Sequence, residues 1–214
     1  LAWSSIIMAK STLLMRLTQG SGMRPQTNMP ARGVGTCQPC LRRPSVPEIS
    51  LHEVLKEGGF EASLITTFNA YLPFYEEIVL SRLRAAGCRH NIVLMDAAQC
   101  HAVYSHEETR PRYAGCEYTL VPMRSRGAFH PKIFLLVGRR KAAIFVGSHN
   151  LTLSGFGYNR ELTTRFEFKP ATDDIGNNIA RQAWRAIEEW LATQGDVLPE
   201  PLSEAVRAVS NFGA

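Results

Sequence analysis

Two short apolar runs joined by a basic turn constrain this chain more than any other part of its sequence. The first run, residues 132–137, follows a histidine at position 130, and the second, residues 142–146, ends in Gly147-Ser148-His149-Asn150. Apolar runs of this length bounded by turn residues are typical of buried strands. Side chains alternate across a strand, so His130 and Lys132 should point to the same side.

This segment carries the groups that a site needs to hold and attack a phosphodiester. An imidazole can act as a nucleophile or an acid–base group, an ammonium can neutralise oxygens, and a Gly-Ser turn can offer free amide N–H groups. A lone His130 is more often a core-edge residue bonded to a carbonyl. Lys132 favours the catalytic interpretation, because a lysine within an apolar strand is rarely structural.

The order and spacing of these residues resemble the H-x-K…G-S-x-N signature of the phospholipase D superfamily, and the similarity extends over residues 51–193. A glutamate often follows the asparagine in that family, and Glu161 stands at that distance. The commonest form has an aspartate five residues after the lysine, where this chain has Val137, which leans away from the lipid-hydrolysing branch. The residues at matching positions are His130, Lys132, Gly147, Ser148 and Asn150.

The resemblance implies an α/β fold with a mixed β-sheet flanked by helices, an α-β-α sandwich, and a metal-independent phosphodiesterase without a cofactor. In that family one imidazole attacks phosphorus to give a covalent phosphohistidine, and a second histidine protonates the leaving oxygen. His130 would be the nucleophile, and Lys132 and Asn150 would hold the non-bridging oxygens. Ser148 and the amides after Gly147 would add hydrogen bonds. Glu161 would orient an imidazole and fix its tautomer.

The sequence holds one H-x-K, whereas the family's active site uses two. The second histidine must therefore come from an identical subunit or from a second half that is absent here. The end of the chain at Ala214 suggests one half of a longer protein, and a homodimer is the alternative. His149 is not a substitute, because beside Asn150 on a turn it should face away from Lys132.

The remaining chain alternates between strand and helix patterns. A strand–helix–strand unit over residues 62–95 implies parallel pairing with a right-handed crossover. Residues 101–115 and 151–158 should be loops with at most a helical turn. Strands are expected at 62–68, 91–95, 118–123, 132–137, 142–146 and 161–168, and helices at 51–57, 73–86, 175–193 and 202–209. The helix over 73–86 should bury a stripe formed by Phe74, Ile78, Leu80, Leu83 and Ala86.

Residues 1–50 differ from the rest in composition and carry six basic residues against one acidic residue, which equals the net charge of +5. We interpret them as a leader outside the fold, either disordered or translated from upstream of the true start. The segment could form a short basic amphipathic helix, and transit peptides have a similar composition. The phospholipase D-like domain, residues 51–214, is neutral overall, so total charge says little about its ligand.

Charge distribution is more informative, because no Asp or Glu occurs from position 118 to 160. A positive patch there would attract a polyanion and favours nucleic acid as the substrate. The alternative is that residues 138–141 form an ordinary solvated hairpin turn. The basic residues in this acid-free window are Arg124, Arg126, Lys132, Arg139, Arg140, Lys141 and Arg160.

Cysteine usage and hydropathy bound the remaining possibilities. Five irregularly spaced cysteines argue against a disulfide framework and favour a reducing cytoplasm. Cys37 and Cys40 form a lone C-x-x-C without a second pair, so we expect no metal site. No run of eighteen apolar residues exists, so we expect no stable membrane insertion.

Three functions remain open from the sequence. A nuclease acting through a phosphohistidine is the leading hypothesis. Phospholipid hydrolysis is the second, and it would need an apolar entry surface. A catalytically degenerate phosphate- or nucleic-acid-binding module is the third, since Val137 and the single motif are compatible with a dead site.

Overall fold

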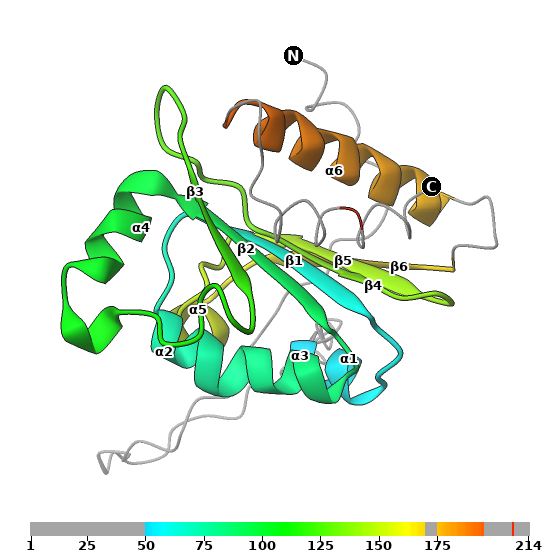
Figure 1. Ribbon diagram of the computed structural model, residues 1–214. Helices are drawn as coiled ribbons and strands as arrows, with labels where there is room; N and C mark the ends of the chain where they lie inside the picture. The colour runs from blue at the N-terminus through cyan, green and yellow to red at the C-terminus, as the bar shows by residue number, and fades with distance from the viewer. Residues whose placement is uncertain (1–49, 170–174, 195–206, 208–214) are drawn as a thin grey trace, which may run out of the picture.

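The computed structural model describes residues 50–169, 175–194 and 207, so the expected leader and nearly all of the expected helix at 202–209 lie outside the described residues. Six strands form one sheet in the order β3-β2-β1-β4-β5-β6 (Figure 1). All six expected strands are present, with ends shifted by no more than two residues. They are β1 (Ala62–Thr67), β2 (His90–Asp96), β3 (Thr119–Met123), β4 (Ile133–Val137), β5 (Ala142–Gly147) and β6 (Thr163–Phe168).

The sheet is mixed, and its topology decides which residues meet. β1 pairs in parallel with β2, as expected, and β2 pairs in parallel with β3. β4 is antiparallel to β1, and β5 and β6 continue the antiparallel pattern. The start of β4 and the end of β5 therefore lie at the same sheet edge as the carboxyl ends of β1 and β2. Such an edge, where strand direction changes, is where open α/β sheets bind ligands.

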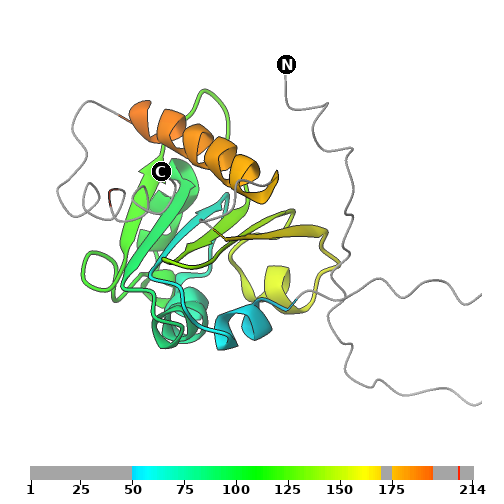
Figure 2. The ribbon, with the colours of Figure 1, turned by 90° about the vertical axis from the view of Figure 1, so that its right-hand side faces the viewer.

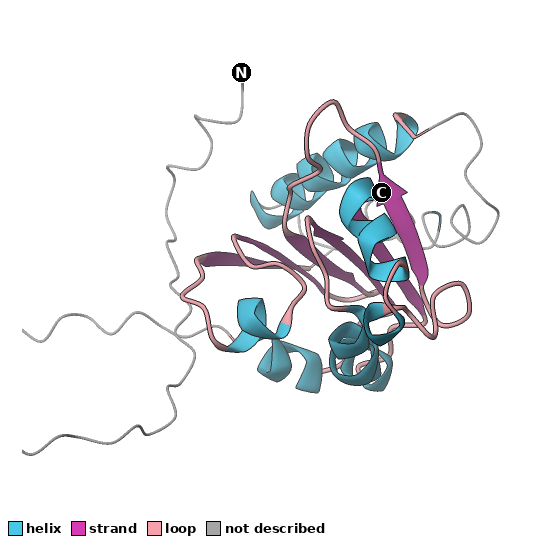
Figure 3. Cartoon of the chain, turned by 90° about the vertical axis from the view of Figure 1, so that its left-hand side faces the viewer, coloured by secondary structure: helices cyan, strands magenta, loops and turns pink. Residues whose placement is uncertain are grey.

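Helices cover both faces of the sheet, which confirms the α-β-α sandwich (Figure 2). Of the described helices, α6 covers one face, packed on alternate residues of the strands, such as Leu64 and Ile144. The other face carries α1, α2, α3 and α5 over residues of the opposite parity, such as Ile65 and Phe145 (Figure 3). The helices are α1 (Leu51–Lys56), α2 (Leu72–Phe74), α3 (Ser81–Ala85), α4 (Ala97–Tyr104), α5 (Leu153–Gly157) and α6 (Ile175–Ala192).

The helix expected at 73–86 contains a π-helical segment, η1 (Tyr75–Leu80), between α2 and α3. A π turn holds more residues than an α turn, so the side chains around it change direction relative to an α-helical stripe. The expectation that Ile78 is buried is therefore wrong, because its side chain is 42% exposed. Glu76 is buried instead, and it accepts hydrogen bonds from the backbone amides of Arg112 and Tyr113 and from the Tyr118 hydroxyl.

The segment after β2 also differs from expectation. α4 begins at Ala97, before the polar stretch that was expected to be a loop. Asp96 caps this helix, since its Oδ1 accepts hydrogen bonds from the backbone amides of Ala98 and Gln99. An aspartate at this position supplies acceptors for otherwise unpaired N–H groups of the first turn. A short 3₁₀ turn, η2 (Glu107–Thr109), follows α4.

Candidate active site

The two parts of the motif lie side by side at the sheet edge. His130 and Lys132 precede β4, which begins one residue later than expected, and Gly147 ends β5. The backbone amide of Gly147 donates a hydrogen bond to the carbonyl of Lys132 at 3.1 Å. The hairpin formed by β4 and β5 therefore brings together residues fifteen positions apart.

His130 and Lys132 are in direct contact, as their spacing predicted. Lys132 Nζ lies 2.9 Å from Nδ1 and 3.3 Å from Nε2 of the imidazole, and it donates to the His130 carbonyl at 3.1 Å. The imidazole itself is exposed, while Lys132 is only 8% exposed. Phe68, just after β1, packs its ring against the imidazole with centroids 4.8 Å apart. Nothing in the sequence pattern marked Phe68, because this contact depends on tertiary structure.

The burial of Lys132 has an electrostatic consequence. Desolvation lowers the pKa of this ammonium from its usual value, and the negative charge of Glu161 partly offsets that effect. Burial disfavours the charged form of a lysine because a poorly hydrated ammonium loses its interaction with water. An anion placed beside Lys132 would compensate for that loss.

Two backbone amides of the Gly-Ser turn, those of Gly147 and Ser148, are already hydrogen-bonded to other segments. The Gly147 amide is used by Lys132, and the Ser148 amide donates to the carbonyl of Leu162 at 3.0 Å. Gly147 has a packing role, because a Cβ there would lie 2.6 Å from Thr163 Oγ1 and 2.7 Å from the Leu162 carbonyl. The backbone amides of Gly147 and Ser148 therefore bind neighbouring segments at this edge of the sheet.

Glu161 contacts Ser148 and not an imidazole. Its Oε2 accepts a short hydrogen bond from Ser148 Oγ, and its Oε1 accepts one from Asn159 Nδ2 at 3.1 Å. Ser148 Oγ also accepts from the Leu162 amide at 3.2 Å. Within the described part of this chain Glu161 bonds to Ser148 and Asn159, so an orienting role toward an imidazole stays a prediction. Because a hydroxyl carries one proton, Ser148 could donate to a phosphate only after giving up Glu161.

The side chain of Asn150 has an unused hydrogen-bond acceptor. Its Oδ1 is buried and has no hydrogen-bond partner among the described residues. A buried acceptor left without a donor costs about 1–3 kcal/mol, so such a group is usually kept for a ligand or a water molecule. The backbone around it is tight, because a Cβ at Gly155 would lie 2.4 Å from the Asn150 carbonyl oxygen.

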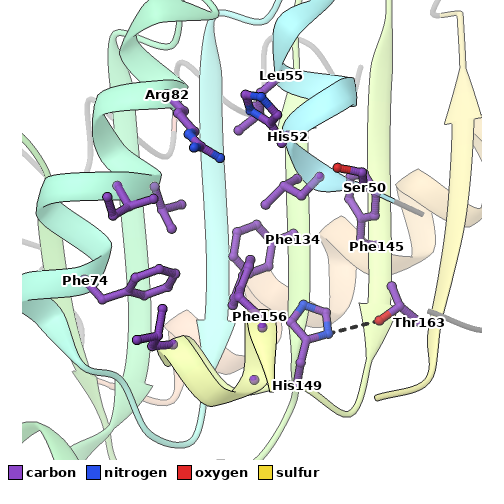
Figure 4. Close-up of a pocket in the computed structure, with 16 residues that line it drawn as sticks. Ser50, His52, Leu55, Phe74, Arg82, Phe134, Phe145, His149, Phe156 and Thr163 are labelled. Atoms are coloured by element: carbon purple, nitrogen blue, oxygen red, sulfur yellow. Dashed lines mark hydrogen bonds between the residues drawn. The ribbon is translucent and has the colours of Figure 1, made fainter. Parts of the chain in front are cut away.

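His149 points into a cavity of about 260 Å³ between the sheet and the helices of one face (Figure 4). Its Nδ1 lies 3.0 Å from Thr163 Oγ1, and its ring packs against Phe134 and Phe156. No hydrogen bond joins it to Lys132 within the described part of the chain. Its pKa is lowered, first by burial; Glu161 counteracts this shift and Lys132 adds to it.

The structure divides the basic residues into two groups. Residues 138–141 connect β4 to β5 at the end opposite to His130, where Arg139 pairs with Glu61 and Lys141 pairs with Glu57. Of the two alternatives, an ordinary hairpin turn at residues 138–141 is therefore the one that the structure supports. Arg124, Arg126 and Arg160 remain in the connections at the motif edge, all exposed.

The segment that carries Arg124 and Arg126 is fixed at both ends. The side chain of Gln194 accepts from the Arg124 amide at 2.7 Å and donates to the Arg124 carbonyl at 3.1 Å. Phe129 is buried against Trp190, with ring centroids 5.6 Å apart. The exposed arginines thus lie on a loop that is anchored immediately before His130.

Two further features bear on chemistry. In residues 50–169, 175–194 and 207, no group of three or more His, Cys, Asp or Glu side chains is placed to hold a metal ion. Over the same residues, no helix combines the length and apolar character needed to cross a membrane.

The mixed sheet and its two helical layers form an α/β sandwich, and the motif lies at one edge of that sheet. A mutant of yeast tyrosyl-DNA phosphodiesterase has this fold, with a TM-score of 0.53 and 11% identity over 77% of this chain. A second mutant of that enzyme gives a TM-score of 0.50 at 13% identity. This chain spans 37% of the length of either yeast chain. The fold expected from the sequence resemblance is confirmed.

Two further solved structures are similar, at lower TM-scores. NucT from Helicobacter pylori gives a TM-score of 0.45 at 13% identity, covering 65% of this chain and 84% of its own. Nuc from Salmonella typhimurium, a phospholipase D family member, gives 0.42 at 12% identity with the same coverage. No protein-family model matches the sequence, and neither does any curated protein.

Proposed function

We propose that this chain is a metal-independent phosphodiesterase that acts on nucleic acid through a covalent phosphohistidine. The observation that carries the proposal is the contact of His130 with Lys132, at 2.9 Å between Nδ1 and Nζ, at the ligand-binding edge of the sheet. An exposed imidazole beside a partly desolvated ammonium suits attack on an anionic phosphorus centre. The fold, shared with a tyrosyl-DNA phosphodiesterase, supports the same chemistry.

The proposed reaction proceeds in two steps. His130 attacks phosphorus, one P–O bond breaks, and the leaving oxygen takes a proton from a second histidine. Water then attacks the phosphohistidine, gives its proton back to that second histidine and releases the phosphate monoester. Lys132 binds the non-bridging oxygens, where its charge is stabilised by the anion, and the Asn150 amide adds a hydrogen bond.

The roles of Ser148, Gly147 and Glu161 are secondary in this proposal. Glu161 holds Ser148, and Gly147 allows the close packing of β5 on β6. Ser148 can donate to the phosphate only if its hydroxyl breaks its hydrogen bond to Glu161 and forms one to the substrate. We assign the second histidine to an identical subunit or to a second half, because His149 is turned into the cavity and bonded to Thr163.

Nucleic acid is the substrate class that the charges favour. Arg124, Arg126 and Arg160 flank the motif edge, and none of them has an ion-pair partner among the described residues. A polyanion crossing this edge would meet cationic groups on both sides of the scissile phosphate. A cytoplasmic location also remains part of the proposal.

The central test is cleavage of a labelled oligonucleotide by the purified chain in excess EDTA. The wild-type protein should cleave and should form an acid-labile, base-stable phosphoryl adduct, whereas His130→Ala should lose both activities by at least about 10³-fold. His101→Ala, at an exposed histidine on α4, is the matched control and should retain activity. Abolition of wild-type cleavage by EDTA would contradict the covalent mechanism.

A further inference from the structure

Three buried side chains at the carboxyl ends of β1 and β2 share one contact pattern. Thr66, Thr67 and Asp96 are 1%, 1% and 6% exposed, and each accepts a hydrogen bond from a backbone amide of another segment. Each of those amides belongs to the residue directly next to a motif residue. The three hydrogen bonds are Ile133 N to Thr66 Oγ1 at 2.9 Å, Leu151 N to Thr67 Oγ1 at 3.1 Å, and Phe129 N to Asp96 Oδ2 at 2.9 Å.

Thr66 and Thr67 bind two segments of the motif, here called its arms, from opposite faces of β1. The first arm is the start of β4 beside Lys132, and the second is the segment after Asn150. Adjacent strand residues point to opposite faces, so one threonine reaches β4 beside Lys132 and the other reaches the segment after Asn150. Thr67 also donates to the Asn69 carbonyl at 2.6 Å, which fixes the direction of its acceptor lone pairs. The amide of Tyr71 donates to the Leu151 carbonyl at 2.9 Å and secures the same segment.

Asp96 connects the third arm of the motif, the segment just before His130, to α4. Its Oδ1 accepts from the first turn of α4, and its Oδ2 accepts from the amide that precedes His130. One carboxylate therefore fixes the start of α4 and the entry to the motif together. A carboxamide cannot replace it fully, because it has a single acceptor oxygen.

We propose that Thr66, Thr67 and Asp96 are positioning residues that set the relative placement of Lys132, Asn150 and His130. None of the three needs to touch substrate, and each acts through the adjacent backbone amide. Catalysis of phosphoryl transfer depends on placement, and errors approaching 1 Å cost about 100-fold in rate. This inference rests on the proposed phosphodiesterase function.

The test compares near-isosteric variants. Thr66→Val and Thr67→Val remove the hydroxyl and keep the side-chain volume, and Asp96→Asn removes one of two acceptor oxygens. We expect kcat to fall about 10- to 100-fold with KM changed by less than about threefold. Thr66→Ser and Thr67→Ser, which restore the hydroxyl, should recover most of kcat.

Ser63→Ala is the matched control. Ser63 is also a buried hydroxyl on β1, but it donates to Asn91 Oδ1 at 2.7 Å at the other end of the strand. Its loss should lower the thermal midpoint as much as the threonine variants do, with kcat within about twofold of wild type. Retention of kcat by both threonine-to-valine variants, or equal loss of kcat in Ser63→Ala, would overturn the inference.

A second readout separates this inference from the proposed function. Amide hydrogen exchange at residues 129–133 and 150–152 should quicken in the three variants and stay unchanged in Ser63→Ala. If the wild-type protein cleaves no phosphodiester, the proposed function fails while exchange still decides whether these side chains hold the motif. Unchanged exchange at all three amides would refute the positioning role, whatever the activity.

Discussion

The ammonium group of Lys132 is buried, and burial of a charged lysine is unfavourable. Its side chain is only 8% exposed, and its pKa is lowered by desolvation. The fold compensates with the His130 carbonyl and with the negative charge of Glu161. A residue that costs stability in the free protein and gains an anionic partner in a complex is typical of a binding site.

His149 gives a prediction about pH. Because burial lowers its pKa in the folded state, the unfolded chain binds the proton more readily, and protonation favours unfolding. This part of the stability is present above the ordinary pKa of 6.5 and is lost as the pH falls through the folded pKa. In urea denaturation between about pH 7 and pH 5, His149→Gln should therefore lose less stability than wild type.

The control for this measurement is His101→Gln, at an exposed histidine. It should keep the wild-type slope of unfolding free energy against pH. Identical slopes for wild type and His149→Gln would show that His149 is not the group responsible. Lys132 and Glu161 remain in both variants, so their charges do not distinguish them.

At this scale the sequence predicted correctly that His130 and Lys132 lie together, although both residues precede β4 and do not lie within it. It could not predict the partners of Ser148 and Glu161. Those contacts depend on the packing of β5 against β6, which places the Ser148 amide opposite Leu162. A motif can show which residue types are present without showing which hydrogen bonds are already occupied.

The helical segment over residues 72–85 gives a prediction at the scale of elements. Ile78 and Leu80 were both expected in the buried stripe, but Ile78 is 42% exposed and Leu80 is 1% exposed. Leu80→Ala should therefore lower the free energy of unfolding by about 2–5 kcal/mol. Ile78→Ala should lower it by less than about 1 kcal/mol. Chemical denaturation of the two matched variants measures the difference, and equal losses would show that Ile78 is as buried as Leu80 in solution.

α4 shows why a short helix can be missed in a sequence analysis. Its eight residues lack a clear apolar stripe, and only Cys100 and Val103 are buried. Asp96 was a usable signal, since aspartate commonly caps a helix. It was read as the end of a strand, and here it serves as both strand end and helix cap.

The distribution of arginines gives a prediction at the scale of the whole molecule. On a His130→Ala background, Arg124→Gln combined with Arg126→Gln should weaken binding of a single-stranded oligonucleotide. It should also reduce the slope of log K against log salt by about 1.4, since each phosphate contact on a single strand contributes about 0.7. Fluorescence anisotropy at several salt concentrations measures both effects.

Arg140→Gln is the control for this surface, because Arg140 lies on the exposed turn at the opposite end of β4. Its affinity and salt slope should match those of the parent. An equal loss in this variant would indicate diffuse charge attraction. Binding to anionic phospholipid vesicles with no affinity for oligonucleotide would instead favour a lipid substrate.

The need for a second histidine can be tested by mixing subunits. If the second imidazole is His130 of an identical chain, dimers with one His130→Ala subunit should be inactive. Activity should then fall as the square of the wild-type fraction in coexpressed mixtures of known composition. A linear fall would mean that each chain works alone, and light scattering on the same samples would establish the mass.

The sequence by itself determined the strands, the parallel unit at the start of the sheet, the placement of His130 and Lys132 on one side and the mixed α/β fold. These follow from local periodicity and from spacing along one strand. Only the tertiary structure decided that Glu161 binds Ser148, that the basic hairpin turn lies away from the motif, and that Thr66, Thr67 and Asp96 hold its arms. These contacts depend on which strand ends share a sheet edge, and strand order is set by long-range pairing that no local pattern encodes.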